Sequence, residues 1–304
     1  MPAQLIPSNT IPSNIRLLEH VNLTQPDQRL ATLFYVVGLG LTRDPYMMVE
    51  LDNLWINIGR TQMHLPTRAA QRLAGRIHLV LPDLALVERS LMAVAPRLAG
   101  TNFAFSRRGP VLEVSCPWGN RFVCVEAHAD QGPRLGITAL EVDVAAGSAA
   151  GIARFYAEVL GAPTRLESSS ERSRADTVAV VAVVEMGGLL PVPGRDEVVI
   201  SQQLRFVETT RSLPAYDGHH VQIYLADAAG PYERCQALGL VTRQANCTDW
   251  RFVRIVDPAD GRVLHELEHE IRDLAHPLFA RPLVNRNPAQ RLAGYRPGAD
   301  ALMC

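Results

Sequence analysis

Three histidines, His20, His78 and His220, stand within the first residues of short apolar runs with strand-like composition. Imidazole is the commonest metal ligand among side chains and also the group that gains or loses a proton near neutral pH. Side chains alternate between the two faces of a strand. A histidine that looks into a hollow therefore shares its face with the residues two and four positions away. This placement predicts metal-ligand or acid–base chemistry inside a cupped sheet.

Arg76 opens the same run as His78. An arginine that points into an apolar cup needs an anionic partner, because an unpaired buried charge is costly. One reading pairs Arg76 with Glu141 or another local acid, and a second pairs it with the carboxylate or phosphate of a bound ligand. A third leaves it in solvent at a frayed strand end. The segment 265–270 lacks the His-Glu-x-x-His spacing and is interpreted as a solvated strand end.

Composition excludes several classes of protein. The chain has 304 residues, of which 47% are apolar and 20% charged, so it is long enough for two globular domains. A net charge of −1 gives no basic footprint for nucleic acid. All thirty basic residues are arginine, which excludes lysine-bound pyridoxal phosphate. There is no dinucleotide-binding fingerprint, and therefore no NAD is expected.

Location and association follow from the same survey. No apolar run reaches the length of a membrane span, and residues 1–14 look like an extended arm rather than a secretory signal. The five cysteines are scattered, which favours free thiols and a cytoplasmic protein. The sequence leaves open whether the protein is a monomer or a homodimer.

The elements that position these side chains repeat along the chain. The segment Phe34-Tyr35 to Gly40 recurs 121 positions later as Phe155-Tyr156 to Gly161, which is the spacing of a duplicated domain. Four units follow, each with the order strand, helix, strand, strand, strand. The predicted fold class is therefore α+β, with four βαβββ modules paired into two cupped mixed sheets and helices on the outer faces.

The predicted division places two units in residues 15–130 and two in residues 131–274, followed by an irregular tail over 275–304. Asp27 and Asp83 are expected to cap the first two helices. A strand is expected near 47–51, and loops are expected over 167–176 and 187–195.

These motifs resemble the vicinal oxygen chelate superfamily, which includes glyoxalase I, extradiol dioxygenases and bleomycin-resistance proteins. The resemblance rests on the Phe-Tyr…Gly helix ends and on the strand-turn-strand at Asp257-Pro258…Gly261, with a similar turn at Pro117-Trp118-Gly119-Asn120. It covers roughly residues 15–272. It implies that the first and last strands of a module each carry a metal ligand facing the cup.

The resemblance carries ligand positions onto this chain. It implies an N-terminal cup with His20, His64 or Gln62, and His78, and a C-terminal cup with His220 and His265 or Glu266. Neither cup matches the family's full ligand set, since Ile137 and Val123 occupy ligand positions. One divalent metal (Fe, Mn, Zn or Ni) is the implied cofactor. The expected substrate-binding residues are Asn22, Arg76 and Gln222.

Two functions remain open at this level. The first is a metal-dependent lyase, isomerase or dioxygenase acting on a small oxygenated molecule, with Glu126, Glu141 or Tyr224 as acid or base. The second is a metal-free protein of the bleomycin-resistance type that sequesters a small molecule. The first is favoured by analogy, because most of the superfamily is catalytic. In either case the expected partner is a small molecule, with neither nucleic acid nor membrane.

Overall fold

The computed structural model describes residues 13–47, 52–128, 135–169, 179–192, 195–279, 281–290 and 292–302. Most of the expected strand near 47–51 and of the expected arm over 1–14 lies outside these residues. Among the described residues, every helix is too short or too polar to cross a membrane.

The four predicted units are present. The first contains β1 (Ile15–Asn22), α1 (Gln28–Ala31), the π-helix η1 (Thr32–Gly38), β2 (Thr42–Arg43), β3 (Asn53–Ile58) and β4 (Thr61–Pro66). The second contains β5 (Gly75–Leu81), α2 (Leu84–Val94), the 3₁₀ turn η2 (Ala95–Arg97), β6 (Ala104–Arg108), β7 (Val111–Ser115) and β8 (Arg121–Glu126). The third contains β9 (Gly136–Ala145), α3 (Ala149–Glu158), β10 (Thr164–Ser169), β11 (Ala179–Val192) and β12 (Arg195–Thr209). The fourth contains β13 (His220–Leu225), α4 (Ala229–Ala237), β14 (Val241–Asn246), β15 (Asp249–Val256) and β16 (Val263–Asp273).

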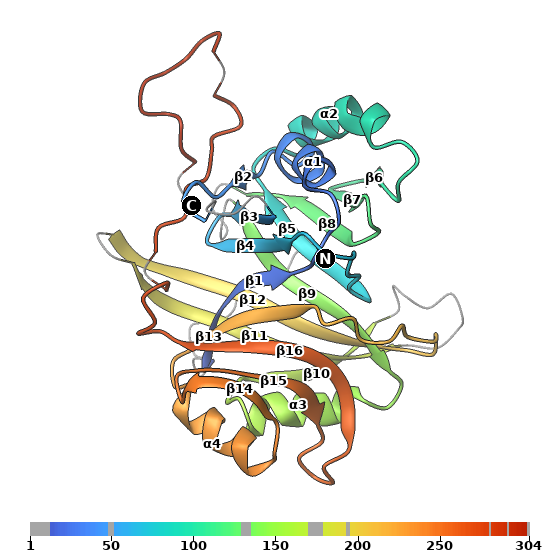
Figure 1. Cartoon of the computed structure of the whole chain (residues 1–304), viewed down its shortest axis with the longest axis vertical. Coiled ribbons are helices and arrows are strands. Elements are labelled where there is room, and N and C mark those ends of the chain that lie inside the picture. Colours follow the sequence, from blue (N-terminus) through green and yellow to red (C-terminus); the bar gives the residue numbers. More distant parts are fainter. Residues whose placement is uncertain are drawn as a thin grey trace.

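The units form two eight-stranded mixed sheets, which confirms the predicted fold class (Figure 1). One sheet has the order β14-β15-β16-β13-β1-β4-β3-β2, and the other has the order β10-β11-β12-β9-β5-β8-β7-β6. In Figure 1, α1 and α2 lie beyond one end of the stacked strands, and α3 and α4 lie beyond the other.

The pairing of the units differs from the expectation that consecutive units share a cup. The first unit pairs with the fourth through the antiparallel contact β1–β13, and the second pairs with the third through β5–β9. Consequently the second and third units, which the predicted division separates at residue 130, belong to the same sheet. The reason is that the leading strand of each unit offers a free edge. Which edges meet is a long-range choice that the local apolar pattern does not encode.

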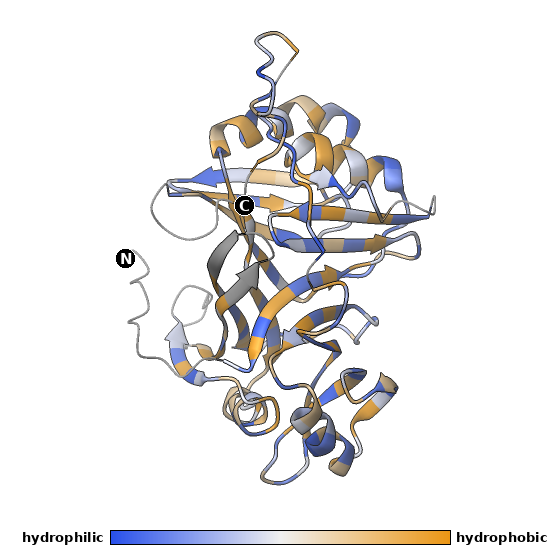
Figure 2. Ribbon diagram, turned by 90° about the vertical axis from the view of Figure 1, so that its left-hand side faces the viewer, coloured by the Kyte–Doolittle hydropathy of each residue, from blue (hydrophilic) through white to orange (hydrophobic). Residues whose placement is uncertain are grey.

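The helices begin and pack as the sequence predicts. The Asp27 carboxylate accepts hydrogen bonds from the amides of Arg29 and Leu30, and the Asp83 carboxylate accepts one from the amide of Leu86, which confirms both caps. The repeated Phe-Tyr pairs are fully buried between helix and sheet. Apolar and polar bands alternate along many strands in Figure 2. One face of each sheet therefore packs on helices, and the other is left for a cup.

Two loops expected from the sequence are parts of strands. Residues 187–192 continue β11, and β12 begins at Arg195, so the two strands form a long hairpin. Gly187 and Gly188 have φ of 114° and 126°, which glycine adopts readily. Because glycines are also common in loops, the sequence predicts a loop where the structure has a strand. In addition, residues 167–169 belong to β10, and residues 170–176 of that expected loop lie outside the described residues.

The hairpin reaches the other sheet. The Gln202 side chain accepts a hydrogen bond from the Leu18 amide at 2.9 Å and donates to the Ile137 carbonyl at 2.8 Å. Ile200 packs with Leu17 and Tyr224 on the cup side of the first sheet. The hairpin therefore closes one end of that cup.

The C-terminal tail closes the same region from another direction. Arg281 Nη1 lies 2.8 Å from Asp44 Oδ2, and its Nη2 donates to Gln62 Oε1 at 3.0 Å. The ring of Phe279 contacts that of Tyr224 at a centroid distance of 4.9 Å. In its described residues, 274–279, 281–290 and 292–302, the tail has no helix or strand, and it is anchored by side-chain contacts.

His269 should make folding stability depend on pH. It is fully buried, stacks on Phe252, accepts a hydrogen bond from the Tyr156 hydroxyl at 2.6 Å and donates to the Leu267 carbonyl at 2.7 Å. Burial lowers the pKa of His269 from 6.5 to about 3. Below pH 6.5, His269 therefore takes up a proton in the unfolded chain but stays neutral in the folded chain. The contribution of neutral His269 to the free energy of unfolding is complete above pH 6.5. It falls by about 1.4 kcal/mol per pH unit as the pH drops toward 3.

We expect urea unfolding in EDTA to show a smaller loss of stability between pH 7.5 and 5 in His269→Gln than in the wild type. Glutamine stays neutral over this range and still accepts from Tyr156. Equal pH dependence in the two proteins would contradict this assignment.

Candidate metal centre

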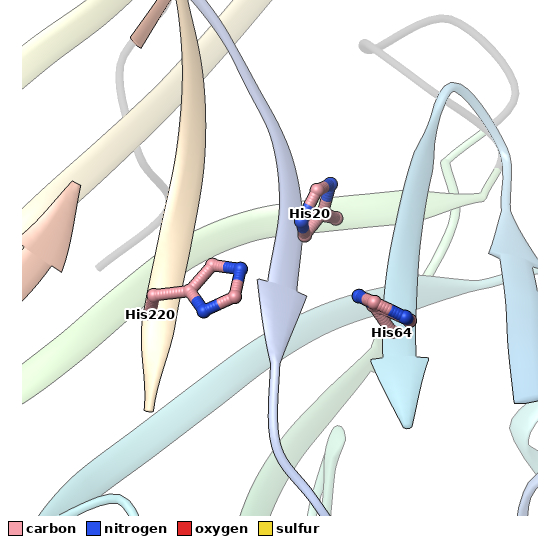
Figure 3. Close-up of side chains that lie close together, drawn as sticks. All are labelled: His20, His64 and His220. Carbon is pink, nitrogen blue, oxygen red and sulfur yellow. The ribbon is translucent and has the colours of Figure 1, made fainter. Parts of the chain in front are cut away.

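Three histidines from neighbouring strands of the first sheet converge on the cup (Figure 3). His20 comes from β1, His64 from β4 and His220 from β13. One nitrogen of each ring lies within 4.8 Å of the other two. Ring centroids are 5.8 Å apart both for His20 with His64 and for His20 with His220. The cluster thus joins the first and fourth units, which lie at opposite ends of the sequence.

The strand registers explain this convergence. His20 lies opposite Gln222 and Asn22 lies opposite His220 in the antiparallel pair β1–β13. His64 lies beside Asn22, and Glu270 lies beside Gln222, in the two parallel pairs. The pseudo-twofold relation between the units therefore exchanges His20 with His220 and His64 with Glu270.

His20 is held by the residue before it. Glu19 Oε2 lies 2.5 Å from His20 Nδ1, which places the ring proton on Nδ1. The other ring nitrogen, Nε2, is buried and has no hydrogen-bond partner among the described residues. A buried ring nitrogen without a hydrogen-bond partner has a lone pair that is available to a metal ion or a ligand.

His64 is fixed by stacking and by two asparagines. Its ring stacks on Trp55 at 3.7 Å with an interplanar angle of 12°. Nε2 donates to Asn53 Oδ1 at 2.8 Å, and Nδ1 accepts from Asn22 Nδ2 at 2.6 Å. Burial, helped by the neighbouring His20, lowers the pKa of His64 to about 3. At neutral pH the ring is neutral, and a metal ion at Nδ1 would take the place of the Asn22 amide.

His220 lies between two carboxylates without a close contact to either. Its Nδ1 is 3.8 Å from Glu268 Oε1, and its Nε2 is 3.7 Å from Glu270 Oε2. Burial, helped by the neighbouring His20, lowers the pKa of His220 to about 2. It is therefore neutral at physiological pH. Neutral imidazole is the form that ligates metals, and no proton has to be displaced first.

The cup around the cluster is polar and charged. Glu270 contacts Arg251 and Arg272, the latter at 2.5 Å, and Glu268 also contacts Arg251. Gln222 is fully buried, and neither polar atom of its amide has a hydrogen-bond partner within the described part of the chain.

Tyr224 lies on the same face of β13 as His220 and Gln222. Burial, with the nearby Glu19 carboxylate, raises the pKa of Tyr224 well above its ordinary value. Its hydroxyl therefore keeps its proton at neutral pH and can act as a donor.

Gln62, the alternative to His64, is used elsewhere. Its amide donates to Asp44 at 3.1 Å and to Asn57 at 2.6 Å, and its oxygen accepts from Arg281. The tail therefore holds Gln62 in a structural network.

The second sheet contains three more of the expected site residues, away from the histidine cluster. Glu141 Oε1 lies 3.4 Å from His78 Nε2, and Glu141 Oε2 lies 4.0 Å from Arg76 Nε. Arg205 approaches the same carboxylate at 3.9 Å and also pairs with Glu167 at 2.8 Å. The local partner weighed for Arg76 is thus present.

The remaining expected residues lie outside both groups. Glu126 Oε2 accepts a hydrogen bond from the Leu84 amide at the start of α2. His265 and Glu266 line a small cavity of about 110 Å³ with Asp143 and residues 213–216. Burial lowers the pKa of His265 to about 4.

Several residues around the cluster were not anticipated from the sequence: Glu19, Asn53, Trp55, Arg251, Glu268 and Glu270. Strand alternation does not predict that Glu19 faces the cup, because β1 contains a register shift between Leu18 and His20. A signal was present, since the buried core residues Leu18 and Val21 are three positions apart instead of two. Glu268 and Glu270 were missed because β16 extends to Asp273.

Comparisons with known proteins place this architecture. No family model and no curated protein matches the chain. Solved structures do. Glyoxalase I from Zea mays aligns over 85% of this chain and 92% of its own, with a TM-score of 0.57 and 15% identity. A protein described as a dioxygenase from Bacillus subtilis aligns over 88% and 91%, with a TM-score of 0.50 and 14% identity. At such identities the likeness shows the fold, and the chain has the fold of the vicinal oxygen chelate superfamily.

Proposed function

We propose that this protein is a metal-dependent enzyme that binds a small molecule through two neighbouring oxygen atoms. The observation that carries the proposal is the cluster of His20, His64 and His220, whose ring nitrogens lie within 4.8 Å of one another. Three protein ligands with open positions are typical of catalytic metal sites. Imidazole ligands suit zinc, iron or nickel.

The donor set fits such an ion on this chain's own chemistry. His20 presents a buried Nε2 without a partner, and His64 and His220 are neutral at pH 7. Glu270 occupies the position related to His64 and is a candidate fourth ligand, although Arg251 and Arg272 hold it. When bound, the metal would act as a Lewis acid on the substrate oxygens.

The surrounding residues define what the chain itself would do. Gln222 presents a buried amide for hydrogen bonding to the ligand, and Tyr224 supplies a protonated hydroxyl. Glu268 is partly exposed near His220 and is our candidate proton acceptor, since geometry comes first in choosing a base. Glu126 and Glu141 lie on the second sheet and have no part in this proposal.

The test uses untagged protein. We expect stoichiometric metal by elemental analysis. In the cobalt-substituted protein, acetohydroxamate should shift the visible absorption because it chelates through two oxygens. Acetamide, which lacks the second oxygen, is the matched control and should leave the spectrum unchanged. Absence of metal would instead favour the metal-free binding protein. Cobalt binding without a response to hydroxamate would contradict chelation of the substrate.

A further inference from the structure

The strand β1 contains a bulge where its functional side chains lie. Leu18 is paired with Ile223 and His20 with Gln222, so Glu19 is an extra residue without an opposite partner on β13. Leu18 and Val21, which flank Glu19 and His20, are both buried in the core on the helix side of the sheet. A β-bulge re-aims side chains next to it. Here it lets two consecutive residues face the cup together.

The bulge creates a direct carboxylate–imidazole pair. Glu19 Oε2 lies 2.5 Å from His20 Nδ1, with side-chain exposures of 11% and 2%. Besides burial, the charge of Glu19 also raises the pKa of Tyr224, which lies on the cup face of β13. Among the described residues, His20 Nε2 has no partner. One nitrogen of the ring is therefore hydrogen-bonded to Glu19, and the lone pair of the other remains unshared.

We propose that Glu19 is a positioning residue for the metal centre: it fixes His20 as the Nδ1–H tautomer so that Nε2 is the ligating atom. This inference rests on the proposed function for its metal, while the tautomer itself is a property of the metal-free chain. A carboxylate that accepts the far N–H of a metal-bound histidine orients the ring and raises its basicity. Losing such a partner typically costs about 10–100-fold in metal affinity.

The role is specific to His20. Asn53, a neutral group, accepts the far N–H of His64, and the carboxylates near His220 are 3.7 and 3.8 Å away. His20 is therefore the histidine of the cluster with a charged partner in hydrogen-bond contact. It is also the central one, since β1 lies between β13 and β4.

The first measurement needs no metal. Imidazole ¹⁵N chemical shifts of the EDTA-treated protein should show His20 as the Nδ1–H tautomer in the wild type. In Glu19→Ala they should show a mixture of tautomers. Glu19→Gln, whose amide oxygen still accepts the hydrogen bond, should retain the Nδ1–H form and serves as the second variant if Glu19→Ala fails to fold. The inference would be overturned if His20 in Glu19→Ala kept the Nδ1–H tautomer alone, or if His20 in the wild type were not in the Nδ1–H form.

The second measurement is zinc affinity by competition with a chromophoric chelator. We expect a loss of about 10–100-fold in Glu19→Ala, a smaller loss in Glu19→Gln because the charge is gone, and no change in Glu266→Ala, an exposed glutamate of the same sheet. Equal zinc affinity in the wild type and Glu19→Ala would overturn the positioning role. Failure of the wild type to bind zinc would count against the proposed function, and the tautomer measurement would still decide the role of Glu19.

Discussion

Replacing His220 by alanine is expected to abolish stoichiometric metal binding, with a loss of affinity of more than about 100-fold. The estimate exceeds the 10–100-fold typical of supporting residues because a direct ligand is removed. The site would keep His20 and His64, which is one ligand fewer than the three that catalytic metal sites usually have. Elemental analysis of untagged protein and zinc competition would measure the change.

Two matched controls separate this result from a general effect of removing a histidine. His78→Ala removes a histidine from the second sheet, and His265→Ala removes one from the small cavity beside Asp143. Both should retain the metal. Circular dichroism would check that His220→Ala is folded. Retention of metal in His220→Ala together with its loss in His78→Ala would move the metal centre to the second cup.

Replacing Gly75 by alanine is expected to destabilise the protein by about 3 kcal/mol or more. A Cβ at this position would meet the Glu141 carbonyl oxygen directly and would lie 2.8 Å from its carbonyl carbon. Both atoms belong to the backbone of β9, so no side-chain rotation relieves the clash. Gly75 lies opposite Val142 in the contact that joins the second and third units.

The comparison variant for this prediction is Gly100→Ala. Gly100 has φ of 81° and open space around its Cβ position, so the cost should be about 1 kcal/mol from backbone conformation alone. Urea unfolding followed by tryptophan fluorescence would compare the two. Similar midpoints for both variants would show that β9 gives way easily at this contact.

Local order was predictable from the sequence. The caps at Asp27 and Asp83 and the repeated Phe-Tyr pairs fixed helix positions, because each rests on contacts within a few residues. Strand alternation also directed attention to His20 and His220. These features depend on short-range geometry, which a single sequence expresses directly.

What escaped prediction was long-range. Four similar units each offer a leading strand as an edge, and the sequence does not say that β1 meets β13 instead of β5. His64 and His220 were therefore assigned to different cups, although they share one. The bulge at Glu19 was hidden for a related reason, since a register shift is defined only against a partner strand.

The union of the first and last units has a consequence for biosynthesis. A nascent chain emerges from its N-terminus, so β1 leaves the ribosome long before β13 exists to cover its open edge. Pairings of such high contact order form slowly. Until β13 is synthesised, the middle units can dock on each other while the leading strand has no partner, and a chain that is terminated before β13 would lack one histidine of the cluster.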